Sequence, residues 1–155
     1  VLADAGYRQY EVSAYSQKGF NCRHNLNYWS FGDYLAIGAG AHGKISFADG
    51  RIQRYAKKRQ PERYLRAGRG EYTASRRDVA ARDIAGEFML NGLRLNEGFS
   101  LDLFGARTGL ARDALEPGLD QCLRAALLEQ NGDRIRATGL GRRFLDSVIA
   151  RFFPG

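Results

Sequence analysis

The chain has 155 residues, of which 44% are hydrophobic and 26% charged, which suits one soluble domain of ordinary size or two small ones. No apolar run approaches the roughly 18 residues that cross a bilayer, and the opening VLADAGYRQYEV is neither a signal nor a transit peptide. Cys22 and Cys122 can build neither a disulfide framework nor a cysteine-only metal site. We therefore expect a cytoplasmic protein with free thiols. The missing initiator methionine predicts a fragment that begins within a fold.

The formal net charge of +7 is concentrated in one segment. Residues 51–82 contain eleven Lys and Arg against three Asp and Glu, a local charge of +8, and the remainder is close to neutral. An anionic partner would bind at this segment if the protein has one.

The first half of the chain predicts strands and loops. Residues 9–16, QYEVSAYS, predict a strand, and QKGFNCRHN follows as a loop. Residues 34–47, YLAIGAGAHGKISF, predict a short buried apolar strand broken by glycines and then an extended stretch. An Asp-Gly turn at 48–51 would join two strands in a hairpin. Pro61 begins a helical turn, PERYLRAG.

The pattern changes to helices at Ser75. SRRD reads as a capping box for a helix that would run through residues 76–95 and end before Gly98. Its expected apolar face is Ala81, Ile84, Ala85, Phe88 and Leu95. Ser100 would cap a short helix, LDLFGA.

The last third predicts two amphipathic helices around a strand. Residues 118–132 would form the first helix, with Leu119, Cys122, Leu123 and Leu127 inward. A turn at 131–133 leads to the strand RIRAT, and Thr138 would cap the last helix. Its inward residues would be Phe144, Leu145, Val148, Ile149 and Phe152. The order of helices and strand in this half is similar to a winged helix, and the whole chain predicts an α+β fold.

Both histidines, His24 and His42, are predicted in loop-like positions where a side chain can face a ligand. A neutral imidazole can ligate iron, zinc or copper. No third ligand stands at a helical spacing, so the pair favours a single axial contact to a heme over a dedicated metal site. The alternative is that one imidazole hydrogen-bonds within a turn and the other packs on aromatic rings.

Gly38, Gly40 and Gly43 form G-x-G-x-x-G after an apolar stretch, the pattern of a dinucleotide loop. KISFADG follows instead of the required helix, so these glycines favour close backbone approach to a ligand, or a tight bend. Nearby, Tyr28, Trp29, Phe31 and Tyr34 would form a core wall or stack on a flat ligand, and a core wall is favoured.

A nucleic-acid interface is the weaker reading of the basic segment. The basic residues precede the helical half, and residues 118–132 carry one Arg and two acidic residues, which makes a poor major-groove reader. A solvated basic surface is favoured.

Four stretches in order, YEVSAYS, CRHNLNYW, FGDYLAIGAGAHG and EFMLNGLRLNEG, resemble the C-terminal part of the oxygen-independent coproporphyrinogen III oxidase-like radical S-adenosylmethionine family. H-N-x-N-Y-W, residues 24–29, is similar to the signature of its heme chaperone branch. The resemblance implies the last strands of a partial (β/α) barrel in residues 1–60, a linker at 61–74 and a helical, winged-helix-like domain at 75–155.

The family's barrel carries a CxxxCxxC motif for a [4Fe–4S] cluster and S-adenosylmethionine, which this chain lacks. We expect no cluster and no radical chemistry from this chain alone, so whether it is part of an enzyme stays open. The resemblance implies heme binding through His24, Asn25, Tyr28 and Trp29, with His24 as the candidate iron contact. Arg23 suits a propionate. Roles for His42, Gly38 and Gly40 are inferred from position alone.

Three hypotheses follow. The first is heme binding and delivery to acceptor proteins, and the second is coproporphyrinogen III oxidation, which decarboxylates propionates in porphyrin biosynthesis. The third is a nucleic-acid-binding winged helix. Because a truncated barrel has exposed strand edges, we also expect dimerisation or strand exchange.

Overall fold

The computed structural model describes residues 1–154 and confirms the α+β class. The chain forms two compact units, one made of residues 1–31 with the chain from 82 onward and the other of residues 32–81. These units do not coincide with the division 1–60, 61–74 and 75–155, which stays a prediction. Within the described part of the chain, no helix is both long and apolar enough to cross a membrane.

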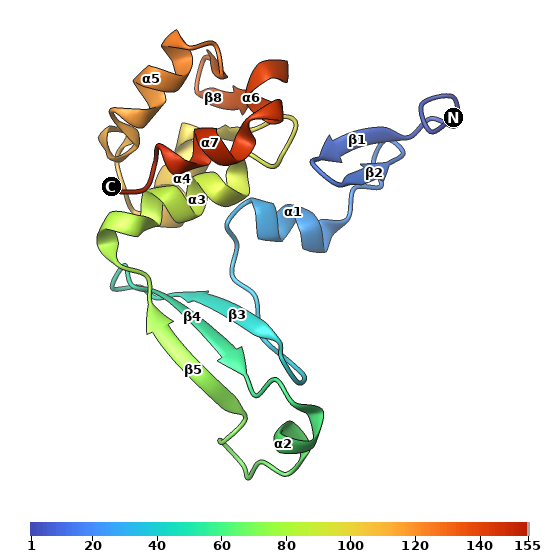
Figure 1. The fold of residues 1–155 in the computed structure, drawn as a ribbon, viewed down its shortest axis with the longest axis vertical. Coiled ribbons are helices and arrows are strands. Elements are labelled where there is room, and N and C mark those ends of the chain that lie inside the picture. Colours follow the sequence, from blue (N-terminus) through green and yellow to red (C-terminus); the bar gives the residue numbers. More distant parts are fainter. Residues whose placement is uncertain (155) are drawn as a thin grey trace. The chain divides into compact units, whose positions relative to one another are not determined.

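The first unit begins with a hairpin, in which β1 (Arg8–Glu11) pairs antiparallel with β2 (Ala14–Ser16) (Figure 1). The prediction of one strand over 9–16 was therefore wrong. The chain reverses after Glu11 because the Glu11 carboxylate accepts hydrogen bonds from the Ser13 backbone N–H at 3.1 Å and its hydroxyl at 2.7 Å. A polar side chain that closes a turn breaks the strand pattern.

Helix α1 (Arg23–Trp29) follows, where a loop was predicted through Asn25. The helix has no side-chain cap and no acidic residue in its first turn, so it lacks the usual signals of a helix start. Its backbone is continuous nonetheless: Leu26 N–H donates to the Cys22 carbonyl at 3.0 Å, and Ser30 N–H to the Leu26 carbonyl at 2.9 Å. Tertiary contacts of its side chains, described below, take the place of local signals.

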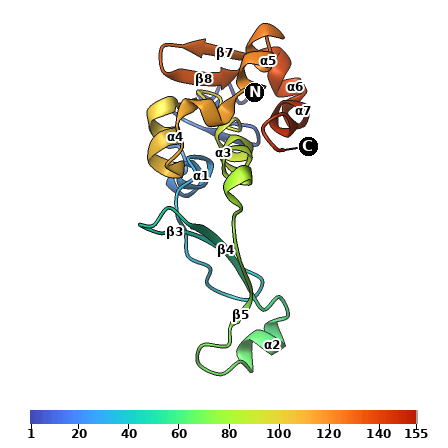
Figure 2. The ribbon, with the colours of Figure 1, turned by 90° about the vertical axis from the view of Figure 1, so that its left-hand side faces the viewer.

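The rest of this unit packs short helices around a three-stranded antiparallel sheet with strand order β6-β8-β7. Figure 2 shows the β7–β8 hairpin beside α5 and α6. The predicted turn at 131–133 and the strand after it are confirmed. In chain order the elements are η1 (Ala81–Asp83), α3 (Ile84–Gly92), β6 (Phe99–Ser100), α4 (Leu101–Thr108), η2 (Arg112–Leu115), α5 (Gly118–Arg124), β7 (Leu128–Asn131), β8 (Arg134–Ala137), α6 (Gly139–Arg143) and α7 (Leu145–Ala150).

Two predicted helix caps are confirmed. The Ser100 hydroxyl accepts a hydrogen bond from Leu103 N–H at 3.1 Å, and the Thr138 hydroxyl accepts one from Gly141 N–H at 3.0 Å. Each cap satisfies a backbone donor that the first helical turn leaves unpaired.

The core of this unit is built around Phe88, which is completely buried on α3. The rings of Phe31, Phe99 and Phe104 lie 5.6, 4.9 and 5.1 Å from it, all edge to face. This geometry is the favoured one for aromatic pairs. The prediction that Phe31 belongs to a core wall is confirmed.

Two predicted helices are shorter than expected. The helix predicted over 118–132 ends at Arg124, and residues 128–131 instead pair with β8. Ala126, with φ of 53°, adopts the left-handed conformation that ends the helix. The last helix is divided into α6 and α7 at Phe144, whose side chain is 55% exposed, so the prediction that Phe144 faces inward was wrong.

The second unit is an antiparallel sheet with order β3 (His42–Ser46), β4 (Ile52–Lys57), β5 (Thr73–Asp78). The predicted hairpin around 48–51 is confirmed, as is the helical turn at Pro61, which is α2 (Pro61–Leu65). Both views place α2 beyond the end of the sheet where β4 leaves and β5 returns (Figures 1 and 2).

Two predictions fail in this unit. Residues 75–78 form part of β5, where a capping box was predicted, because their backbone pairs with β4; the helix begins only at Ile84. The predicted buried strand within 34–41 is irregular, with Leu35 and Ile37 being 73% and 84% exposed. Gly38 and Gly40, with φ of 98° and 71°, interrupt an extended backbone there.

Candidate functional site

The H-N-x-N-Y-W stretch lies on α1, and helical periodicity divides its side chains among three faces. The first face carries Asn25 and Trp29, one turn apart. Asn25 Nδ2 donates a hydrogen bond to the Tyr10 hydroxyl at 3.1 Å, and the Arg94 guanidinium lies 4.3 Å from the Trp29 ring centre. This face holds the helix against the β1–β2 hairpin and the segment after α3.

The Arg94 side chain is itself held in place by an ion pair with Glu11. Glu11 is 1% exposed, and its Oε2 lies 3.6 Å from Arg94 Nη2. Trp29 Nε1 and Arg94 Nε are buried without a hydrogen-bond partner. Sequence reasoning missed Glu11 and Arg94 as site residues. A signal existed, because Glu11 lies within the predicted strand and Arg94 within the predicted helix, each beside an apolar residue.

The second face of α1 borders a groove of about 270 Å³. Leu26 and Ser30 line it from the helix, and Tyr10, Leu95 and Phe99 are among the residues that line it from other elements. The groove is too small for a whole porphyrin, which is of drug size or larger, since such ligands occupy roughly 300–1,000 Å³.

The third face carries His24 and Tyr28, again one turn apart. His24 is exposed and makes no hydrogen bond or ion pair within residues 1–154. Tyr28 is half-buried, with its ring edge to face against Trp29 at 5.0 Å. Arg23, at the start of the helix, is exposed. An accessible imidazole beside an aromatic ring can approach a metal at the centre of a flat ligand.

The other predicted site residues belong to the second unit, whereas the α1 stretch belongs to the first. His42 is exposed and is the first residue of β3, so its loop assignment was wrong. The Gly38 N–H donates to the Tyr64 hydroxyl at 3.3 Å, and the Gly40 N–H donates to the Lys58 carbonyl at 2.9 Å. Because these donors are used within the unit, they do not present a free phosphate-binding nest.

The second unit also contains an ion pair between buried Lys44 and partly exposed Asp33 that the sequence did not indicate. Lys44 is 1% exposed, and its ammonium lies 3.0 Å from Asp33 Oδ1 and 3.1 Å from the Ser46 hydroxyl. Partial burial raises the pKa of Asp33, but hydrogen bonds from the Ser46 backbone, Lys44 and the Ser46 hydroxyl outweigh it and leave that pKa below its ordinary value. The pair ties the segment after α1 to the sheet.

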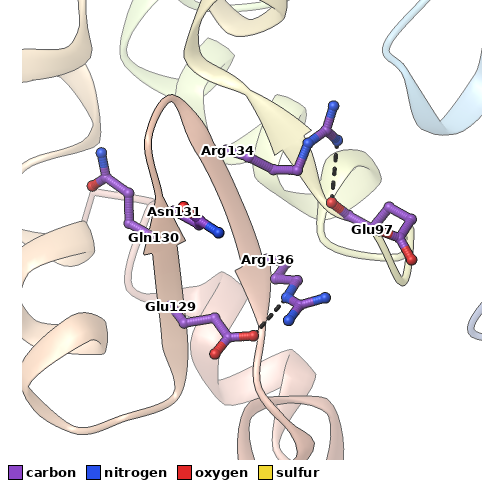
Figure 3. Close-up of a pocket in the computed structure, with 6 residues that line it drawn as sticks. All are labelled: Glu97, Glu129, Gln130, Asn131, Arg134 and Arg136. Carbon is purple, nitrogen blue, oxygen red and sulfur yellow. Dashed lines mark hydrogen bonds and ion pairs between the residues drawn. The ribbon is translucent and has the colours of Figure 1, made fainter.

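A polar pocket of about 260 Å³, separate from the groove beside α1, lies at the β7–β8 hairpin (Figure 3). Its lining holds two glutamates and two arginines, so its formal charges balance. Arg136 Nε lies 2.5 Å from Glu129 Oε1, and Arg134 Nη1 donates to the Glu97 backbone carbonyl at 3.2 Å. Figure 3 shows both guanidiniums directed toward these partners rather than into open space.

The described residues do not suit an iron–sulfur cluster. Residues 1–154 contain no group of three or more His, Cys, Asp or Glu side chains that could hold a metal ion. Cys22 is exposed just before α1, whereas Cys122 is buried on α5. Burial raises the pKa of the Cys122 thiol, which disfavours the thiolate that a cluster would need.

The comparisons with known proteins agree with the predicted resemblance. Residues 79–144 match the model of the HemN C-terminal domain. The fold is similar to that of coproporphyrinogen III oxidase HemN from Escherichia coli, a radical SAM enzyme, with a TM-score of 0.62 at 13% identity over 97% of this chain and 38% of that one. Over nearly its whole length, the chain is similar to proteins of the HemN-like radical SAM family.

Several of the similar curated relatives are named heme chaperones. The chain is 45% identical to heme chaperone HemW of Escherichia coli and 43% identical to that of Haemophilus influenzae, in each case over 98% of this chain and 39% of the relative. It is 30% identical to the mitochondrial radical S-adenosyl methionine domain-containing protein 1 of Danio rerio, over 96% of this chain and 36% of that protein. The chain thus spans about two fifths of the length of these relatives.

Proposed function

We propose that this chain is the C-terminal part of a heme chaperone that binds heme and delivers it to acceptor proteins, with His24 as the iron ligand. One observation carries the proposal: within a stretch resembling the chaperone signature, α1 leaves His24 exposed while Asn25 and Trp29 hold the helix in place. An exposed ligand suits a protein that must release its cargo. The 43–45% identity to heme chaperones supports the same reading.

The proposed roles of neighbouring residues follow from their positions. Tyr28, one turn after His24, would flank the porphyrin face, and Arg23 would meet a propionate. His42, Gly38 and Gly40 stand as weaker candidates for contact with heme. In the longer protein, a [4Fe–4S] cluster and S-adenosylmethionine would be held by the barrel motif, which this chain lacks.

The proposed architecture is the end of a radical SAM barrel followed by a winged-helix-like domain. The order α3, β6, α4, α5, β7, β8 with an antiparallel sheet β6-β8-β7 supports the second part. Cytoplasmic location, acceptor proteins and dimerisation or strand exchange remain predictions.

The test is a hemin titration of the chain, followed by absorbance in the Soret region. We expect a Soret shift that the His24→Ala variant loses or weakens at least about tenfold, because an axial iron bond is removed. His42→Ala is the comparison, since it removes the other exposed histidine, and it should weaken binding less than His24→Ala does. A folded sample that shows no Soret shift, or equal loss in both variants, would contradict His24 as the ligand.

The second candidate function is coproporphyrinogen III oxidation, which the HemN-like fold favours. Decarboxylation by a reconstituted longer protein would support it over the chaperone function. The third, nucleic-acid binding, would require salt-dependent binding of duplex DNA.

A further inference from the structure

One pocket of the first unit is lined by three arginines, Arg94, Arg142 and Arg143. It has a volume of about 360 Å³ and is formed by Val12, Arg94 and the six residues from Arg142 to Ser147 at the junction of α6 and α7. We propose that this arginine pocket binds the carboxylates of a porphyrin. The inference rests on the proposed function, because it names a second contact for the same ligand.

Two of the three guanidiniums are already held in place. Arg94 stacks on Trp29 and is paired with buried Glu11. Arg142 Nη2 donates a hydrogen bond to the Asn96 carbonyl at 3.1 Å. A ligand therefore does not have to order these long side chains, which lowers the entropic cost of binding.

The pocket has an excess of positive charge. Arg143 is exposed and makes no hydrogen bond or ion pair with any residue of the described chain. Glu11 matches the charge of Arg94, and Asp146 is the acidic residue of the lining, so the two arginines of α6 outnumber it. Guanidinium groups bind carboxylates through paired, charge-assisted hydrogen bonds. The hairpin pocket offers no such excess, because Glu97 and Glu129 in its lining balance the charges of its two arginines.

Apolar groups beside the arginines indicate what kind of molecule would carry the carboxylates that the pocket binds. Phe144 is 55% exposed because the helix breaks there, with φ of −118° and ψ of 33°. Val12, at the tip of the β1–β2 hairpin, is also exposed. An accessible ring next to guanidiniums suits an acid on a flat apolar body better than a small inorganic anion.

The pocket is also connected to α1. Trp29, the last residue of the H-N-x-N-Y-W stretch, lies against the Arg94 side chain that lines the pocket. Heme has two propionates on one edge and an iron at its centre. Through the Trp29–Arg94 contact, the proposed carboxylate site is linked to α1, the helix that carries the proposed iron ligand.

The experiment compares hemin, metal-free protoporphyrin and hemin dimethyl ester on the full chain. Arg143→Gln and Arg142→Gln should each weaken hemin and protoporphyrin binding about tenfold, the loss expected for one charge-assisted hydrogen bond. The ester lacks free carboxylates, so it should bind weakly and equally to all variants. Arg107→Gln on α4 is the matched control, because Arg107 is exposed and outside the pocket. It should leave all three ligands unaffected.

The outcomes separate this inference from the proposed function. If hemin binds and depends on His24, but esterification and both arginine variants have no effect, the pocket proposal is wrong and the chaperone proposal stands. Protoporphyrin has no iron for His24, so its response to the arginine variants tests the pocket even when His24 is not the ligand. Displacement of protoporphyrin by millimolar inorganic phosphate would reveal a general anion site and overturn the assignment to porphyrin.

Discussion

Gly98 shows how a single residue fixes the packing of the first unit. Its φ is +65°, and a Cβ at this position would lie 1.9 Å from the Ile135 carbonyl oxygen. Ile135 is fully buried and pairs with Phe99 between β6 and β8. Only glycine allows the backbone to come this close to the strand.

We predict that Gly98→Ala destabilises the protein by about 3 kcal/mol or more, because it adds a clash with backbone to the cost of a positive φ. Urea unfolding measures the loss. Gly109→Ala is the control: its φ is +72°, but a Cβ there meets nothing within 4 Å. That variant should lose only about 1 kcal/mol. Equal losses would show that backbone conformation alone accounts for the effect.

A second prediction at the residue scale concerns how the Asp33–Lys44 ion pair makes stability depend on pH. The pKa of Asp33 is lowered in the folded chain, so the stability it contributes is present above the unfolded pKa of about 3.9. It is lost as the pH falls through the lower folded pKa. Asp33→Asn should therefore weaken the second unit at pH 7 by about 1–2 kcal/mol, since Lys44 loses a charged partner and the carboxylate is partly exposed.

Hydrogen exchange of the β3 amides at pH 7 and near pH 3 would measure this difference. The gap between Asp33→Asn and the unaltered chain should shrink at the lower pH. Asp49→Asn is the comparison, because Asp49 pairs with exposed Arg51 in the same unit, and such surface pairs contribute little. A gap that stays constant with pH would mean that the Asp33 charge does not stabilise the sheet.

At the scale of elements, local signals in the sequence predicted local structure well. The hydroxyls of Ser100 and Thr138 cap helices as expected, and the turns at 48–51 and 131–133 join strands. Each of these signals acts within a few residues, so no distant contact is needed to interpret it.

Three of the failures share one physical cause, which is pairing or packing with other segments of the chain. Ser75 and Asp78 have the spacing of a helix start, but β4 offers their backbone a complete ladder. Residues 128–131 fall within the helix predicted over 118–132, yet they pair with β8. The start of α1 carries no cap, and side-chain contacts to Tyr10 and Arg94 stabilise it instead. Tertiary contacts of this kind override local propensity.

At the scale of the whole molecule, the two cysteines report separately on folding. Cys22 is exposed, whereas Cys122 is buried and burial raises its thiol pKa. We predict that a thiol reagent at pH 8 modifies Cys22 rapidly and Cys122 only upon unfolding, because the reactive species is the thiolate. Mass spectrometry after timed labelling would distinguish the two sites. Rapid modification of Cys122 in a folded sample would contradict the packing of α5.

The candidate site could be predicted only in part. The H-N-x-N-Y-W resemblance singled out α1, but sequence position placed His24 and His42 together, whereas they belong to different units. The Glu11, Arg94 and Trp29 cluster joins residues more than sixty positions apart in the sequence. No local pattern reveals such a contact, because it depends on how the hairpin, α1 and the end of α3 meet.

The division of the chain also bears on folding order. The first unit is discontinuous, since residues 32–81 are inserted between Phe31 and the chain from 82 onward. Phe31 packs against Phe88, so the core of this unit forms only after the ends of the insertion come together. Closing a flexible loop of this length costs entropy. If residues 32–81 fold first into their own sheet, the loop that must be closed becomes shorter. Local unfolding of that sheet alone can then leave the phenylalanine core of the first unit intact.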